Sequence, residues 1–183
     1  MSAVAALVVT NGCGRERVGP TTETTFKLSK QHALKIAPPP GWVVINAGTV
    51  DRVLRLQFVP RGRREAQFYL VLSLLREGTD PNLVTSEDLQ RASKQAAEET
   101  IRGKTASAPM FFELRGKQGI GYFYRLEDLS LPLPPGDRRD ACQGFMAIGQ
   151  FRAKATILYE LGEKWVLNGA LETLENAEDV TPR

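Results

Sequence analysis

The sequence has little of what most catalytic centres are built from. It contains one histidine and two cysteines in 183 residues. The histidine, His32, follows Ser29-Lys30-Gln31 in a segment typical of a surface turn, so a Ser–His or Cys–His nucleophile pair has no visible origin. Cys13 and Cys142 are far apart, and together with one histidine they fall short of an ordinary zinc site. We therefore expect no bound metal, no cofactor and no enzymatic activity.

Long apolar runs and a strong charge of one sign are also missing. No stretch reaches the roughly 20 apolar residues that a membrane-spanning helix needs. The net charge is only +3, and basic and acidic residues alternate along the chain. This balance is not typical of a nucleic-acid-binding protein, so we expect no nucleic-acid partner. The hydrophobic share of 42% and the charged share of 25% indicate an ordinary globular domain.

Several short patterns are superficially similar to functional motifs. The glycine-rich segment Gly116–Gly121 lacks the Gly-Lys-Ser/Thr ending of a phosphate loop, and strand-forming aromatics follow it. Gln143–Phe151 lacks the basic residue and the second aromatic of the RNA-recognition signature. Glu127 and Asp128 form an adjacent pair of carboxylates at a strand end. Neighbouring strand residues point to opposite faces, so we do not expect the two to share one site. Cys142 lies in an apolar strand, where we expect a buried and unreactive thiol.

The first residues have a pattern typical of a targeting segment. Ala3–Val9 is an apolar run with the length of a signal-peptide core. Gly12 directly before Cys13 resembles the lipobox of bacterial lipoproteins, in which the cysteine is lipidated and becomes the first residue of the mature protein. Thr10 stands where the lipobox usually has Leu, and no Lys or Arg precedes the run. The other interpretations are a first strand or a frayed tail.

Residues 1–25 are therefore predicted to form a leader and a polar tether, and residues 26–183 a single domain. The second half of this domain holds three runs of strand length that are rich in apolar, aromatic and β-branched residues, separated by Gly and Pro. These runs are Gly119–Asp128, Cys142–Phe151 and Ala153–Leu161. They predict an α+β fold with a central antiparallel sheet of about seven strands flanked by helices.

Further strands are expected earlier in the chain. They are Phe26–Leu28, Ala33–Ile36, Trp42–Asn46, Arg52–Val59, Ala66–Leu75 and Pro109–Arg115. Ala66–Leu75 is almost continuously apolar, which is typical of a central strand covered on both faces. Trp42, after three prolines and a glycine, is predicted to anchor the core.

Two helices complete the prediction. Ser86–Arg102 has either Thr85 or Ser86 as its N-cap and acidic residues in its first turn, and its apolar stripe runs through Leu89, Ala92, Ala96 and Ile101. The terminal helix Trp165–Ala177 carries apolar residues at helical spacing. We expect Asp179–Arg183 to be a polar tail.

Two basic loops are the candidate binding residues. One holds Arg61, Arg63 and Arg64, and the other holds Arg138 and Arg139. The second lies in Leu129–Ala141, the longest irregular stretch, where prolines favour a semi-rigid arm. These charges either only keep the loops solvated or bind an anionic surface, such as an acidic partner or lipid headgroups.

The order of elements, together with Pro-Pro-Gly-Trp, Gly-Tyr-Phe-Tyr-x-Leu-x-Asp, Cys-Gln-Gly-Phe-Met and Ala-Thr-Ile-Leu-Tyr, resembles the PsbP-like superfamily. This superfamily includes the photosystem II subunit PsbP, a Ran-binding nuclear transport factor and DcrB-like bacterial envelope lipoproteins. The resemblance covers about Phe26 to Ala177. It implies an α/β/α sandwich and a role in binding other proteins or assisting assemblies, with no catalytic motif.

The leading functional hypothesis is a non-enzymatic lipoprotein of the bacterial cell envelope, on the periplasmic side. It would be anchored to the membrane through Cys13 and would bind or assist a protein partner. The alternative is a small hydrolase or ligand-binding protein that uses a cleft beside Leu129–Ala141.

Overall fold

The computed structural model describes residues 23–29, 31–39, 41–50, 53–61, 67–74, 85–102, 106–127, 140–160 and 163–181. In these ranges the chain forms ten strands and two helices. In chain order the elements are β1 (Thr24–Lys27), β2 (Ala33–Ile36), β3 (Trp42–Val50), β4 (Val53–Pro60), β5 (Gln67–Leu74), α1 (Ser86–Ile101), β6 (Met110–Gly116), β7 (Gly119–Glu127), β8 (Asp140–Ile148), β9 (Phe151–Tyr159), α2 (Lys164–Glu175) and β10 (Glu178–Asp179).

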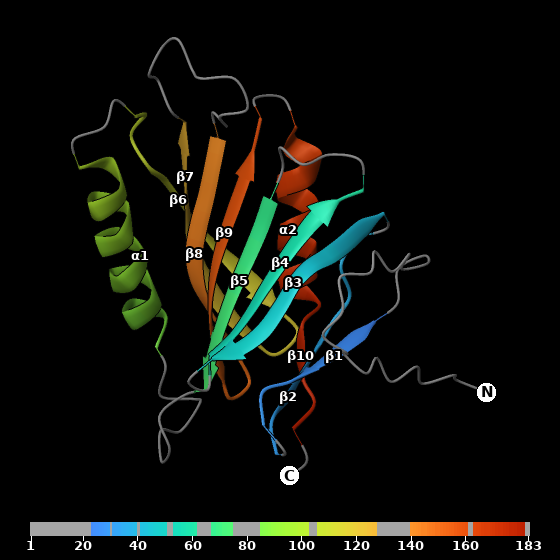
Figure 1. Cartoon of the computed structure of the whole chain (residues 1–183). Helices are drawn as coiled ribbons and strands as arrows, with labels where there is room; N and C mark the ends of the chain where they lie inside the picture. Colours follow the sequence, from blue (N-terminus) through green and yellow to red (C-terminus); the bar gives the residue numbers. More distant parts are fainter. Residues whose placement is uncertain are drawn as a thin grey trace.

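Seven strands form one antiparallel sheet in the order β3-β4-β5-β9-β8-β7-β6 (Figure 1). Its second half is the meander β6 to β9, in which the turn between β8 and β9 needs a positive φ of 54° at Gly149. β5 then pairs with β9 and joins this meander to β3 and β4. The predicted α+β class, with a central antiparallel sheet of about seven strands flanked by helices, is confirmed.

The main hydrophobic core lies between the sheet and α2. Alternate residues of the strands point to this side, among them Phe68 and Leu70 of β5 and Phe123 of β7, none of which is exposed to solvent. α2 contributes an apolar stripe to the same cluster, formed by Val166, Leu167, Ala170 and Leu174. Each of these large side chains contributes roughly 1.5–3 kcal/mol when it leaves water, so this layer holds most of the folding energy.

Trp42 takes the anchoring position predicted from the sequence. Its side chain is only 7% exposed and makes edge-to-face contacts with Phe68 of β5 and Trp165 of α2. Such pairs add about 0.5–1.5 kcal/mol beyond the burial of their area. Trp42 thus ties the edge strand β3 to both the sheet and the helix.

α1 covers the opposite side of the sheet, where its main contacts are with β7 and β8. The helix begins as predicted, because the Thr85 side chain accepts a hydrogen bond from the Asp88 backbone N–H. The predicted stripe is confirmed in part: Leu89 is buried, and Ala96 and Ile101 are partly buried and pack against the cluster beneath the helix. The other fully buried residues of the helix, Ser93 and Ala97, were not in the predicted stripe.

Ser93 explains why the buried stripe lies where it does. Its hydroxyl donates a hydrogen bond of 2.6 Å to the backbone carbonyl of Tyr122 in β7. A buried polar side chain therefore attaches the helix to the sheet. The small cluster beneath α1 contains Ala97, Tyr124 and Leu126. Apolar spacing alone cannot identify a serine as the contact residue.

The predicted polar tail after residue 178 is a second correction. Glu178 and Asp179 form β10, which pairs with β2 in a separate sheet of order β1-β2-β10. Asp179 also accepts a hydrogen bond from the Gln150 N–H in the β8–β9 turn. Glu178 and Asp179 are therefore fixed by tertiary contacts. A strand of two acidic residues has no recognisable pattern in the sequence.

The third correction concerns β5. Its apolar run predicted coverage on both faces, but only Phe68, Leu70 and Leu72 are buried, and Tyr69 and Val71 between them are partly exposed. The reason is that α1 lies over β7 and β8 and leaves this side of β5 without a helix among the described residues. One half of the central sheet therefore has an open side.

Candidate functional site on the open face of the sheet

The open side is defined by the strand positions that point away from α2. We give the name open face to ten of these positions in the part of the sheet beside α1: Val53, Arg55, Gln57, Tyr69, Val71, Ser73, Phe145, Arg152, Lys154 and Thr156. These residues belong to β4, β5, β9 and β8, which are neighbours in the sheet. None of the ten is acidic. In Figure 1 these strands are seen with α1 to one side of them and α2 behind.

Three cations lie close together on this face. Strand register aligns Arg55 with Val71 and Val71 with Lys154, so Arg55 and Lys154 are two strands apart. That separation is about 10 Å, and Arg152 lies about 7 Å from Lys154 along the same strand. All three side chains are exposed.

An aromatic ring lies beside two of these cations. Phe145 of β8 is directly opposite Lys154 in the register. The Arg152 guanidinium carbon is 5.7 Å and the Lys154 Nζ is 5.8 Å from the centre of its ring. Contacts of this kind contribute about 0.5–1 kcal/mol at exposed sites and hold the cations above the sheet. We call Arg55, Phe145, Arg152 and Lys154 the cationic patch.

A row of polar contacts lies beside the patch and crosses the sheet. The Gln143 amide donates a 2.9 Å hydrogen bond to the Thr156 hydroxyl, and its carbonyl oxygen accepts one from Tyr124. The Tyr124 and Thr100 hydroxyls lie 3.0 Å apart and connect this row to α1. On β4 and β5, the Gln57 amide donates to the Tyr69 hydroxyl at 3.0 Å. These bonds fix the amide orientations next to the patch.

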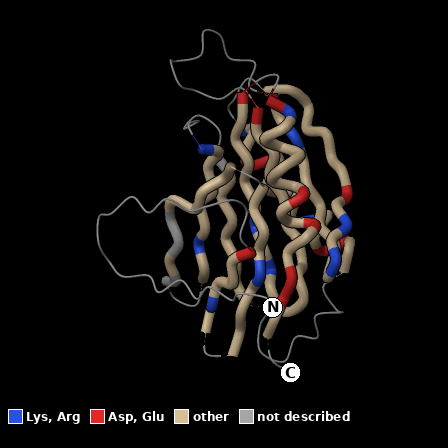
Figure 2. Tube along the Cα trace, turned by 90° about the vertical axis from the view of Figure 1, so that its right-hand side faces the viewer, with Lys and Arg blue, Asp and Glu red and all other residues tan. Residues whose placement is uncertain are grey.

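The cations of the patch differ from the four described cations that form ion pairs, and what sets them apart from the other exposed cations is their grouping on one face. Lys35, Arg91, Arg115 and Lys117 each have a carboxylate within 4 Å. Within the described ranges, no carboxylate forms an ion pair with Arg55, Arg152 or Lys154. Basic and acidic segments are otherwise mixed along the described chain (Figure 2). Among the described residues, the patch is thus a local excess of positive charge with no carboxylate partner.

Most of the binding residues predicted from the sequence cannot be placed. Cys13, Arg63, Arg64, Arg138 and Arg139 lie outside the described residues. Arg61 is described: it is exposed just after β4, and its backbone N–H donates a 2.7 Å hydrogen bond to the Gly41 carbonyl. The two basic loops therefore remain predictions.

His32 and Cys142 behave as their sequence context predicts. The His32 Nδ1 lies 3.0 Å from the Ser29 hydroxyl in a solvent-facing turn. Cys142 is a free, fully buried thiol. Burial raises the pKa of Cys142 to about 12, against a smaller lowering by the charge of Arg125. At neutral pH the thiol is therefore protonated and is a poor nucleophile.

Cys142 belongs to a buried group on the α2 side that also contains Arg125, Asp140 and Tyr159. Burial raises the pKa of Tyr159 to about 12, so its phenol is neutral as well. The Tyr159 hydroxyl and the Arg125 Nε have no hydrogen-bond partner among the described residues. No trio of His, Cys, Asp or Glu suited to a metal ion occurs in the described ranges. This group offers neither a nucleophile nor a metal site.

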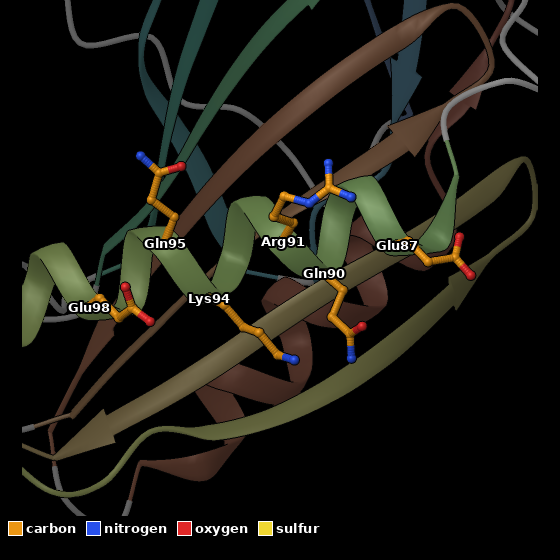
Figure 3. A pocket seen from close by; sticks show the side chains of 6 residues that line it. All are labelled: Glu87, Gln90, Arg91, Lys94, Gln95 and Glu98. Atoms are coloured by element: carbon orange, nitrogen blue, oxygen red, sulfur yellow. The ribbon is translucent and has the colours of Figure 1, made fainter.

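A shallow hollow of about 370 Å³ lies against the outer side of α1 (Figure 3). Its described lining comes from this single helix: Glu87, Gln90, Arg91, Lys94, Gln95 and Glu98. Gln90 and Lys94 point to one side of the helix, whereas Arg91 and Gln95 point to the other. Because these side chains diverge and carry both signs of charge, they do not converge on a ligand.

The cationic patch itself was not predicted from the sequence. The signal was present in β9, where Arg152 and Lys154 alternate with the buried residues Phe151, Ala153 and Ala155. Period-two alternation puts both cations on one face. Arg55 joins them only through the register of β4, β5 and β9, which the sequence does not reveal.

Comparisons with protein families and with curated proteins identify no relative of this chain. Among the helices of the described chain, neither has the length and apolarity to cross a bilayer. The geometry of the open face is therefore the best guide to function.

Proposed function

We propose that this protein is a non-enzymatic binding protein that engages an acidic segment of a protein partner through its open face. One observation carries the proposal: three exposed cations share about 10 Å of sheet with no acidic residue among the ten positions of the face. Folding does not explain this grouping, because like charges repel. An anionic partner would relieve the repulsion.

The chemistry of the patch suits carboxylates on an extended segment. Arg55 and Arg152 each present a planar fork that matches a carboxylate, and Lys154 adds a point charge between them. The exposed part of Phe145 offers an apolar contact beside these charges. Each exposed ion pair is worth about 0.2–1 kcal/mol, so binding should be modest and sensitive to salt.

The cellular setting follows from the sequence. We propose an envelope lipoprotein whose Gly12-Cys13 site is processed and lipidated, with the domain on the periplasmic side of the membrane. A diacyl group and an N-acyl chain would give firm attachment, since each buried CH₂ contributes about 0.8 kcal/mol. With its native upstream sequence, Cys13→Ala should move the protein from the membrane to the soluble fraction. An intact Met1 in the mature protein would refute lipidation.

The basic loops fit the same proposal. Arg61, Arg63 and Arg64 follow β4, the strand that carries Arg55, and Arg138 and Arg139 precede β8, the strand that carries Phe145. They would enlarge the positive surface for an acidic partner. The alternative, a hydrolase or ligand-binding cleft beside 129–141, depends on a stretch of which only Asp140 and Ala141 are described. No contact of the described residues favours it.

A defined acidic probe tests the proposed activity. Fluorescence anisotropy would follow the binding of labelled octaglutamate to the full chain at about 0.05 M salt, with octalysine as the probe of opposite charge. We expect octaglutamate alone to bind. The triple variant Arg55→Ala/Arg152→Ala/Lys154→Ala should weaken this binding at least about tenfold, which is roughly 1.4 kcal/mol.

The matched control removes the same number of charges elsewhere. Arg91→Ala/Lys94→Ala/Lys164→Ala replaces three exposed cations on the two helices. This variant has the same net charge as the patch variant and should bind octaglutamate within about twofold of the wild type. If both triple variants lose affinity equally, binding follows net charge and the open face is not the site.

A further inference from the structure

The two edges of the central sheet are not equivalent. β3 forms one edge, and its register with β4 shifts at a bulge between Val44 and Asn46. Bulges at an edge bend the strand and discourage pairing with another chain. β6 forms the other edge and pairs with β7 in unbroken register from Met110 to Gly116. Among the described strands, none pairs with its outer side.

The residues of β6 make this edge suited to pairing. Met110 is 60% and Phe111 is 41% exposed, which is unusual for two adjacent large apolar side chains. Alternate residues of an edge strand direct their backbone N–H and C=O groups outward, where they can pair with another strand. β6 is also well supported from behind, since Phe112 stacks on Phe123 with ring centres 5.8 Å apart.

The charged residues of β6 indicate which strand could pair with this edge. Glu113 and Arg115 lie on the same side of β6, and in the single chain the Arg115 Nε is 2.6 Å from a Glu113 carboxylate oxygen. In an antiparallel pair of two β6 strands centred on Leu114, Glu113 of each copy lies opposite Arg115 of the other. Two opposite-charge pairs then form across the interface, each worth roughly 0.2–1 kcal/mol in a sheet.

We propose that β6 is a self-association edge, through which two copies of this chain pair antiparallel with Leu114 opposite Leu114. The seven strands of each copy then form one continuous sheet, with both α1 helices on the same side. The neighbouring antiparallel register, centred on Glu113, places two carboxylates directly opposite each other and is disfavoured. This inference does not use the cationic patch, which lies on β4, β8 and β9.

Sedimentation of the full chain over a range of concentrations tests the proposal. A reducing buffer prevents disulfides through Cys13. The wild type should show a concentration-dependent shift from the monomer mass of 20.2 kDa towards twice that mass. A wild type that stays monomeric up to about 1 mM overturns the proposal.

Charge reversal then identifies the interface. Glu113→Arg and Arg115→Glu place like charges opposite each other in the pair, so each should raise the dimer dissociation constant at least about tenfold. An equimolar mixture of the two variants has opposite charges at both positions and should recover a dimer that holds one copy of each. Native mass spectrometry distinguishes this heterodimer by its mass. If Glu113 and Arg115 matter only within one chain, the mixture stays monomeric, and the proposal fails.

Two further measurements keep the result interpretable. Circular dichroism and melting temperature show whether each variant is folded, because both charge reversals remove the Glu113–Arg115 pair and Glu113→Arg also removes the 2.9 Å hydrogen bond from Tyr122. Glu113→Gln discriminates between registers. It weakens a dimer centred on Leu114, whereas it strengthens one centred on Glu113, so stronger association of this variant would overturn the proposed register.

Discussion

The two sides of the central sheet are built from alternate residues of the same strands and yet differ in solvent exposure, apolarity and charge. The side under α2 is closed by large apolar residues, such as Phe68 and Leu70, that have no solvent exposure. The open face carries Arg55, Arg152 and Lys154, all exposed, beside a row of amide and hydroxyl contacts. One side stabilises the fold, and the other leaves charge available for a partner.

From this difference we expect substitutions in one strand to affect either stability or the proposed binding, according to the side on which the residue lies. Phe68 and Tyr69 are adjacent in β5, but Phe68 stacks on Phe58 with ring centres 5.2 Å apart, while Tyr69 lies on the open face. Substitutions on the α2 side should therefore change the free energy of unfolding. Substitutions on the open face should change binding. Four stability predictions test this separation, from the largest expected effect to the smallest.

Truncation on β5 compares the two sides directly. Phe68→Ala should lower the free energy of unfolding by about 3–5 kcal/mol, because it removes a fully buried ring and leaves a cavity. Val71→Ala, on the open face of the same strand, should cost only about 1 kcal/mol. Urea denaturation followed by circular dichroism measures both values. Equal losses would show that the open face is as tightly packed as the core.

The stability at alkaline pH tests the burial of Cys142 on the α2 side of the sheet. Burial raises its pKa from 9.0 to about 12, so the unfolded chain loses this proton first and stability falls between pH 9 and 12. By about pH 10.5 the loss due to this thiol should be about 2 kcal/mol. The unfolding free energies of wild type and Cys142→Ala should therefore converge or cross as the pH rises. A constant difference between them would mean that the thiol is not desolvated.

Weakening the attachment of α1 to the sheet is expected to lower the stability by an intermediate amount. Ser93→Ala removes the 2.6 Å hydrogen bond to the Tyr122 carbonyl and should destabilise the protein by about 1 kcal/mol. Ser86→Ala, whose hydroxyl bonds the Tyr122 side chain at 3.2 Å in a more exposed place, is the matched control and should cost less. Thermal unfolding ranks the two. A larger loss for Ser86→Ala would contradict the described packing of α1.

The patch variant should have the smallest effect on stability. Arg55→Ala/Arg152→Ala/Lys154→Ala removes exposed side chains that have no ion pair among the described residues. It also removes the two contacts with the Phe145 ring, but the relief of charge repulsion offsets part of that loss, so the free energy of unfolding should change by less than about 1 kcal/mol. Differential scanning calorimetry at low salt is suitable. A loss above about 2 kcal/mol would give these cations a structural role instead.

The fold was predictable because its signals are local. Apolar runs identified the strands of the central sheet, and the Thr85 cap with its acidic first turn identified α1. β10 was missed because Glu178 and Asp179 are polar and become a strand only by pairing with β2. The buried stripe of α1 was predicted only in part, because Ser93 is buried through a hydrogen bond and not through apolarity.

The candidate site was less predictable than the fold. Arg55 is about a hundred positions from Arg152 and Lys154 in sequence, and only the pairing of β4, β5 and β9 brings them onto one surface. Sequence clustering instead favoured Arg63–Arg64 and Arg138–Arg139, which are neighbours along the chain but lie outside the described residues. Local charge density along a chain is a poor guide where a sheet assembles a surface from distant strands.

The central claim is that the open face binds an acidic partner, and mapping by nuclear magnetic resonance tests it most directly. The ¹⁵N-labelled full chain would be titrated with octaglutamate, and amide shift changes would be followed residue by residue. We predict the largest changes at Arg55, Phe145, Arg152 and Lys154, with little change on α2. Changes confined to residues 61–64 and 138–139, or no changes at all, would contradict the claim.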